Sequence, residues 1–344
     1  MSSPLATLYD RADALCNLAP WGWMKEVELL AFRHPALPEL AYLSVMGAQG
    51  DHRCLAVYLG EESLHRINLI HEAPYLGIDL DADDQVGLIL ESRQLQVSFS
   101  SRAQLEKYDL DQIKSLDRKY RGKVWPQFRS MRPGRAAGPL DDVEIEVLTA
   151  AITQVLDVAP RISAGLVTDS RRTPRFQILG REQGPDGQWR DFWHNFDDTE
   201  YVFPTTGCDP ELAREVARLR TSVDVQVAFT LLPTPVGPRF GEQSYPYILM
   251  AVDSKSGTVM GVEVLSVETC THEALLAAVP DVLLRLLKKA GARPALIRTT
   301  SYRTASLLAG LAKELNIAIH REREIPELEA ALHSLRGMMM RGPM

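Results

Sequence analysis

The 344-residue sequence predicts two folded regions, an N-terminal α+β region and a following α/β domain with a mixed β-sheet. Strand-like runs dominate the first part of the chain, whereas helices and strands alternate after Val223. An apolar content of 45% is enough to build a core in each region. We place the boundaries at 1–160 for the α+β region, 161–208 for an aromatic-rich hairpin segment that joins the two, 209–336 for the α/β domain and 337–344 for a disordered tail.

The N-terminal region is expected to begin with a helix over 5–18, because Leu8, Ala12, Leu15 and Leu18 recur at helical spacing. The pattern then changes to strand-like runs separated by turn residues. Strands are predicted at 27–33, 41–46 and 53–59, a helix at 61–70, and a further hairpin from 87–91 and 95–99. This order is typical of an antiparallel sheet accompanied by helices.

An acidic segment precedes that last hairpin. Asp79, Asp81 and Asp83 have the spacing of the first three ligands of a calcium-binding EF-hand loop. The pattern then fails, since Asp84 stands in place of the glycine at position six and Leu90 in place of the glutamate at position twelve. We therefore interpret the segment as a solvated loop that binds no metal.

The most unusual composition lies between Arg118 and Arg135, where seven basic and three aromatic residues occur without an acid. Cations suit phosphates and aromatic rings can stack on bases, so this stretch is a candidate surface for nucleic acid or an acidic partner. The candidate binding residues are Arg118, Lys119, Arg121, Lys123, Trp125, Phe128, Arg129 and Arg132. The alternative is structural: the aromatic residues pin an irregular segment to the core, and the arginines pair with some of the 45 acids. The net charge of −7 favours this alternative.

Helices are expected at 109–120 and at 141–158, and the second starts with acids, as a helix N-terminus prefers. An arginine-rich segment at 171–175 and two strands around the turn 184–187 follow. Aromatic density then peaks, with Trp189, Phe192, Trp193, Phe196, Tyr201 and Phe203. Such a cluster either packs a small sheet against a neighbouring domain, which we favour, or presents a surface to a protein partner.

The α/β domain is predicted to start with three strands. Residues 223–229 alternate apolar side chains with Asp224 and Gln226, which indicates a strand with two different faces. The continuous apolar run 247–252 suits a strand covered on both sides. The turn residues 253–257 then lead back into a third strand at 258–265.

Alternating helices and strands complete this domain. Thr271 is a helix cap and Gly291 a helix stop, and Pro280 between them predicts a kink or a break. Pro326 opens the last helix. Between these helices we expect a strand at 295–299, a helix at 301–314 and a short strand at 317–320.

This order, βββαβαβα, is similar to the ribonuclease H-like fold of retroviral-type integrases and transposases. The strand with Asp224 ahead of Leu232–Val236, and the phrase Ala251–Gly261, strengthen the likeness. The resemblance implies a carboxylate cluster for two divalent metal ions, with Asp224 as its first acid and Glu327 or Glu329 as a further one. At the end of the fourth strand, where an acid should stand, the sequence has Arg298-Thr-Thr-Ser.

The chain also resembles an uncharacterised bacterial family of domains of unknown function, which implies a cytoplasmic bacterial protein and no particular activity. No zinc, phosphate-loop or nucleophile-elbow motif occurs, and no apolar run approaches the roughly 20 residues of a membrane span. We expect a non-catalytic binding or regulatory protein on a degenerate ribonuclease H-like scaffold, without cofactor or metal, that contacts nucleic acid or an acidic partner. The alternatives are a metal-dependent nuclease or transposase-derived enzyme that uses Asp224, and a protein-interaction module that uses the Trp189–Phe203 surface.

Overall fold

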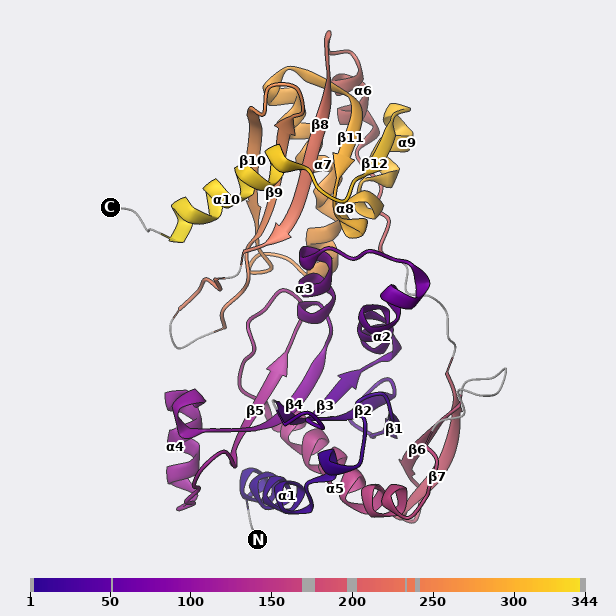
Figure 1. The fold of residues 1–344 in the computed structure, drawn as a ribbon, viewed down its shortest axis with the longest axis vertical. Coiled ribbons are helices and arrows are strands. Elements are labelled where there is room, and N and C mark those ends of the chain that lie inside the picture. The colour runs from indigo at the N-terminus through magenta and orange to yellow at the C-terminus, as the bar shows by residue number, and fades with distance from the viewer. Residues whose placement is uncertain are drawn as a thin grey trace. The chain divides into compact units, whose positions relative to one another are not determined.

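The computed structural model describes residues 3–50, 52–168, 177–196, 203–232, 234–238 and 242–340 (Figure 1). The chain forms two compact units: Met1–Ile67, Ser92–Arg132 and Ala137–Glu200 form the first, and Asn68–Glu91, Pro133–Ala136 and Tyr201–Met344 form the second. The arginine-rich segment 171–175 and Tyr201 lie outside the described residues. Over the described part of the chain, no helix combines the length and apolar character that a membrane crossing requires.

The first unit contains a seven-stranded sheet in the order β5-β4-β3-β2-β1-β6-β7. Its strands are β1 Leu30–Arg33, β2 Ala41–Met46, β3 Arg53–Leu59, β4 Gln94–Ser100, β5 Trp125–Met131, β6 Gln177–Gln183 and β7 Trp189–Asn195. Neighbours pair antiparallel except β1 and β6, which are parallel. The hairpin β6–β7 is thus part of this sheet, and the segment around Trp125, expected to be irregular, is a regular strand.

Helices cover both faces of this sheet. α1 (Pro4–Leu18) and α5 (Asp142–Ser163) pack together over one face, with Leu8 and Ile152 fully buried in the same core as strand residues such as Leu55. The opposite face buries Tyr42 and Ala56 against the start of α2 (Glu61–Leu76). α4 (Lys107–Ser115) and two short 3₁₀ helices, Pro20–Gly22 and Arg102–Gln104, lie in the connections.

The second unit contains a five-stranded mixed sheet in the order β10-β9-β8-β11-β12. Its strands are β8 Thr221–Leu231, β9 Tyr247–Asp253, β10 Val259–Leu265, β11 Ala292–Thr299 and β12 Ala318–Arg321. β9 is antiparallel to β10 and β8, whereas β8, β11 and β12 are parallel. All five strands predicted for this region are therefore confirmed.

Two different helix layers cover this sheet. One face packs against α6 (Pro210–Ala217), α7 (His272–Ala290), α8 (Tyr302–Leu307) and α9 (Ala309–Leu315), and the other against α10 (Pro326–Met340), which crosses it in Figure 1. Thr271 and Gly291 cap α7 as predicted. Of the kink or break predicted at Pro280, the break does not occur, since the helix continues through this residue. α10 extends to Met340, so residues 337–340 are helical and were wrongly placed in the disordered tail.

The acidic segment and the strand predicted at 87–91 are the main corrections. Residues Ala82–Leu90 form helix α3, whose first turn is capped by the Asp81 side chain, which accepts a 2.7 Å hydrogen bond from the amide of Asp84. An apolar run as short as 87–91 fits a strand or a buried helix equally well, so the cap decides. The segment is also not a solvated loop, because Asp84 is only 1% exposed. It belongs to the second unit.

Candidate functional site

A pocket of about 520 Å³ surrounds Asp224 on the α10 side of the five-stranded sheet. Side chains alternate along a strand, so Asp224 and Gln226 of β8 share the face on which Ala228 packs with α10. The end of β9, the end of β11 and the chain leading into α10 complete the walls. The lining residues used below are Asp224, Gln226, Ser254, Arg298, Glu322 and Glu327.

Arg298 joins two acids in this pocket. Its Nη2 lies 3.4 Å from Oδ2 of Asp224, and its Nη1 donates a hydrogen bond to Oε1 of Glu322. These bonds, the one to Glu322 first, raise the pKa of the Arg298 guanidinium, so the residue is a permanent cation. The arginine noted at the end of the predicted fourth strand therefore bridges the first predicted acid to an acid that sequence analysis did not single out.

The residues here do not fit the pair of divalent ions that the resemblance implies. Among the described residues, no group of three His, Cys, Asp or Glu side chains is arranged to hold a metal ion. The two further acids proposed from sequence have other partners: Glu327 accepts from Nε2 of Gln226 at 3.2 Å, and Glu329 accepts from the amide of Ile325 at 3.4 Å. We therefore derive no metal-dependent step at this site.

Two buried polar atoms in the pocket wall have no hydrogen-bond partner among the described residues. They are Oε1 of Gln226, a residue that is 4% exposed, and Oγ of Ser254. A buried polar atom without a partner costs roughly 1–3 kcal/mol, and such atoms are uncommon in folded proteins. Both residues line the Asp224 pocket, so its wall contains polar atoms whose hydrogen-bonding capacity is not used by the described residues.

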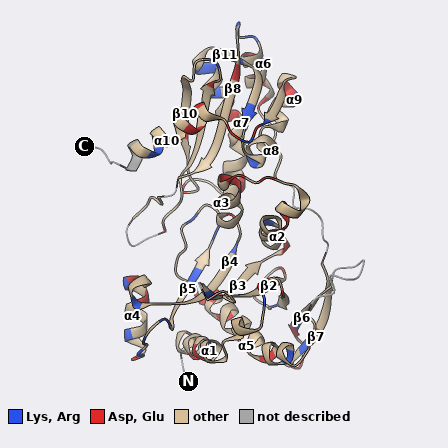
Figure 2. Ribbon diagram, viewed as in Figure 1, with Lys and Arg blue, Asp and Glu red and all other residues tan. Residues whose placement is uncertain are grey.

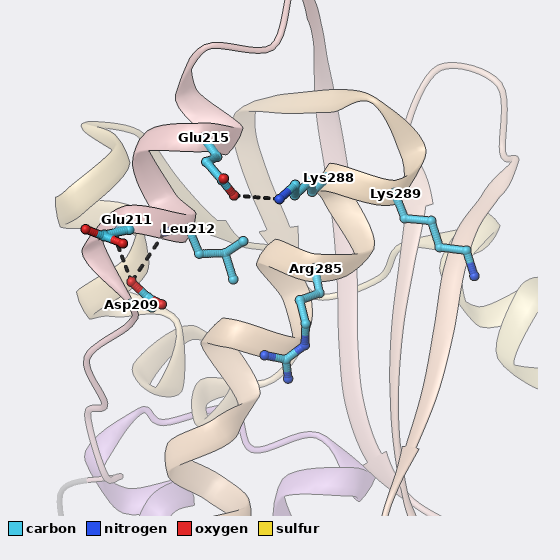
Figure 3. A pocket seen from close by; sticks show the side chains of 7 residues that line it. All are labelled: Asp209, Glu211, Leu212, Glu215, Arg285, Lys288 and Lys289. Atoms are coloured by element: carbon cyan, nitrogen blue, oxygen red, sulfur yellow. Dashed lines mark hydrogen bonds and ion pairs between the residues drawn. The ribbon is translucent and has the colours of Figure 1, made fainter.

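A second hollow lies between α6 and α7, with a volume of about 620 Å³ (Figure 3). Its walls carry both signs of charge, and Lys288 is paired with Glu215 at 2.6 Å. Arg285 and Lys289 are exposed at its rim. No atom of its lining is among the buried unpartnered groups of the described residues, so the Asp224 pocket is the stronger candidate site.

Most arginines of the 118–135 stretch form ion pairs with acids of the first unit. Arg118 donates to Asp13 at 2.6 Å, to Asp10 and to the carbonyl of Ala6 at 3.0 Å, and its guanidinium lies over the ring of Tyr9. A cation held in this way is not presented to a separate ligand. The structural alternative predicted from the net charge applies to this residue.

Arg129 and Arg132 are also paired. Arg129 is 8% exposed and makes two hydrogen bonds of 2.7 and 2.8 Å to Asp109, a residue of α4 in which acidic and basic positions are interspersed (Figure 2). Arg132 lies 3.1 Å from both Asp141 and Glu144. Arg129 of β5 and Arg132, which directly follows this strand, each pair with acids at the start of a helix.

The remaining candidates of the stretch divide by burial. Phe128 is a core residue at 4% exposure, and Trp125 is half-buried with its ring 5.6 Å from that of Tyr120. Lys119, Arg121 and Lys123 are exposed, and none of them forms an ion pair with a described residue. Of the eight predicted binding residues, these three cations are the ones presented to solvent.

The aromatic residues of β7 also divide between core and surface. Trp189 stacks on Phe32 with ring centroids 5.6 Å apart, and Phe196 is buried, so these two act as packing residues. Trp193 is 50% exposed on β7, which ends the seven-stranded sheet. Among the described aromatic residues of the predicted interaction surface, Trp193 is the one that is exposed.

The second unit also contains a buried ionic cluster that was not predicted from the sequence. Glu91 and Arg303, each 2% exposed, form an ion pair, and the same Glu91 oxygen lies 3.3 Å from both the Tyr247 hydroxyl and Nε2 of His272. The guanidinium of Arg303 also lies 4.8 Å from the centroid of the Phe229 ring. No local pattern marks these residues, because Glu91 and Arg303 are 212 positions apart.

Asp84 caps the start of α8 from helix α3. Its carboxylate accepts hydrogen bonds from Oγ of Ser301 at 2.6 Å and from the amides of Tyr302 and Arg303 at 2.8 and 3.2 Å. Burial, with a smaller contribution from the charge of Asp81, nevertheless raises the pKa of the Asp84 carboxyl to about 6. These hydrogen bonds hold α3 against the start of α8 within the second unit.

Comparison with known proteins gives family membership without an activity. No curated protein matches the chain. Residues 212–336, which include every strand of the five-stranded sheet, match a family model described as a domain of unknown function (DUF6930). Residues 6–177, half of the chain, match a model described as a domain of unknown function (DUF7309). The chain therefore belongs to the DUF7309 family and carries a DUF6930 region in its second half.

Proposed function

We propose that this chain is a non-catalytic binding protein whose second unit is a degenerate ribonuclease H-like domain. The scaffold part of the proposal is supported by the order of elements from β8 to α10, which is βββαβαβα when α8 and α9 are taken together as the second helix. The family descriptions name no activity. A bacterial, cytoplasmic setting stays a prediction of the resemblance.

The observation that carries the proposal is the position of Arg298 between Asp224 and Glu322. A divalent ion that bridged these acids would have to displace a guanidinium or lie beside it. Two unit charges of the same sign 4 Å apart repel by about 4 kcal/mol at the effective dielectric constant of a protein surface, and a divalent ion doubles this cost. Two-metal phosphodiester cleavage is therefore opposed at the place where the scaffold would perform it.

A cleavage assay tests this proposal. Single- and double-stranded DNA, RNA and an RNA–DNA hybrid are incubated with the full chain in Mg²⁺ and in Mn²⁺, with Asp224→Ala as the matched variant. We expect both proteins to leave every substrate intact. Metal-dependent cleavage by the natural chain that disappears in Asp224→Ala would show that the chain is an enzyme.

A second candidate function, contact with nucleic acid, is favoured by the three exposed cations Lys119, Arg121 and Lys123. Three phosphate contacts predict a slope of about −2 for the logarithm of affinity against the logarithm of salt on a single strand. Replacing all three cations with Ala is expected to abolish this dependence, whereas Arg132→Ala, which removes a paired arginine, leaves it. This candidate would be excluded if the chain did not bind nucleic acid, or if Arg132→Ala weakened binding as much as the triple replacement.

A further inference from the structure

Resting on the proposed function, we propose that the Asp224 pocket binds an organic cation, an ammonium or guanidinium group carried by a free polyamine or by a side chain of a basic peptide. Three properties of the pocket support this ligand class: its charge, its unpartnered acceptors and its resident arginine.

The charge of the pocket is strongly negative. Five carboxylates line it against two cations, namely Asp224, Asp253, Glu322, Glu324 and Glu327 against Lys255 and Arg298. Hydrogen bonds from the amide and hydroxyl of Ser256 lower the pKa of the Asp253 carboxyl, which keeps it ionised. Arg298 carries one positive charge against the two acids that it touches. An anionic ligand is therefore repelled, and a cationic ligand is attracted.

The unpartnered atoms call for a hydrogen-bond donor. The Gln226 amide is oriented by its nitrogen, which donates to Glu327 at 3.2 Å, so its buried oxygen is the atom without a partner. An amide oxygen can only accept, and the Ser254 hydroxyl can accept as well. An ammonium group offers three donors and a guanidinium group five. A cationic donor group therefore suits the unpartnered oxygens as well as the carboxylates that line the pocket.

Arg298 disfavours a divalent metal ion more strongly than an organic cation. Mg²⁺ requires near-ideal octahedral geometry at 2.0–2.1 Å and releases its water reluctantly. An ammonium or guanidinium group accepts looser geometry and carries a single charge, so its repulsion by Arg298 is half that of a divalent ion. The same guanidinium that opposes a metal therefore leaves room for an organic cation beside Glu324 and Glu327, whose side chains are exposed.

Calorimetric titration of the full chain tests the inference with two probes, spermidine and an acetylated, amidated trilysine peptide. The double variant Glu324→Gln, Glu327→Gln removes two exposed carboxylates of the pocket. Glu263→Gln is the single-site control, because Glu263 is exposed on β10 and lies outside the pocket. We expect saturable binding that weakens about tenfold for each charged hydrogen bond lost in the pocket and stays unchanged in the control.

Each outcome of the titration decides a separate point. Binding of spermidine alone identifies a free polyamine as the source of the cation, and binding of trilysine alone identifies a basic peptide. Binding of neither probe, or equal weakening by Glu263→Gln, overturns the inference. Nuclease activity in the cleavage assay would instead overturn the proposed function, so the two failures are distinguishable.

Discussion

At the residue scale, burial separates the charged side chains that hold the fold from those that face solvent. In the 118–135 stretch, the sequence does not distinguish one basic residue from another. In the structure, some of these residues form ion pairs and others are exposed to solvent. Arg129 and Lys123 are only six positions apart, yet the first is buried against Asp109 and the second is exposed. Composition alone cannot make this division, because the acids that accept the arginines lie elsewhere in the chain.

The pair Arg129 and Lys123 gives a matched stability test. Arg129→Ala leaves Asp109, which is 2% exposed, without its cation, and we expect the free energy of unfolding to fall by about 3–5 kcal/mol. Lys123→Ala removes the same charge from an exposed site and is expected to change it by no more than about 0.5 kcal/mol. Urea denaturation measures both values. Similar effects of the two substitutions would contradict the assignment of Arg129 to the fold.

Asp84 predicts a pH dependence of stability. Its pKa is raised to about 6 in the folded state from an ordinary value of 3.8, so the folded chain binds this proton more tightly than the unfolded chain. The contribution of Asp84 to stability is therefore largest at low pH, falls as the pH rises from about 4 to about 6, and is constant above that. The expected loss is on the order of 1–3 kcal/mol.

The variant Asp84→Asn isolates this contribution, because an amide oxygen still accepts a hydrogen bond but does not titrate. Thermal unfolding at pH 4, 5, 6 and 7 should show a smaller loss of stability with rising pH in Asp84→Asn than in the natural chain. Parallel pH profiles for the two proteins would show that this carboxyl does not titrate over that range.

At the element scale, the five-stranded sheet could be predicted strand by strand, because alternation and turn residues are local signals. Helix α3 could not, since its apolar residues form a short run and its fixing contacts come from α8. The candidate site was predictable in part. Asp224 and Arg298 stood out in sequence. The contacts of Glu322 with Arg298 and of Gln226 with Glu327 could not be predicted, because they depend on the chain before α10 folding back to the sheet.

Gly87 tests how closely α3 packs. A Cβ added at Gly87 would come 2.4 Å from Nη1 of Arg303, the atom that pairs with Glu91. We expect Gly87→Ala to destabilise the chain by about 1–3 kcal/mol, because a buried guanidinium must shift. Gly337→Ala in α10, whose added Cβ meets no atom within 4 Å, should be neutral or stabilising by up to about 1 kcal/mol. Equal effects in a chemical denaturation series would contradict the close packing.

At the scale of the whole molecule, each unit has its own sheet and its own hydrophobic core. The units do not follow chain order, since Asn68–Glu91 belongs to the second unit although it lies between strands of the first. A boundary drawn along the sequence cannot anticipate this exchange. Contacts between residues far apart in the chain connect this segment to the start of α8, namely the hydrogen bond from Ser301 to Asp84 and the ion pair of Glu91 with Arg303.

We propose that Arg298 excludes a metal ion from Asp224 and Glu322 in the second unit. Calorimetric titration of the full chain with Mn²⁺, in parallel with Asp224→Asn, tests it most directly. We predict the same weak, non-saturating heats for both proteins. Saturable Mn²⁺ binding to the natural chain that is lost in Asp224→Asn would contradict the claim.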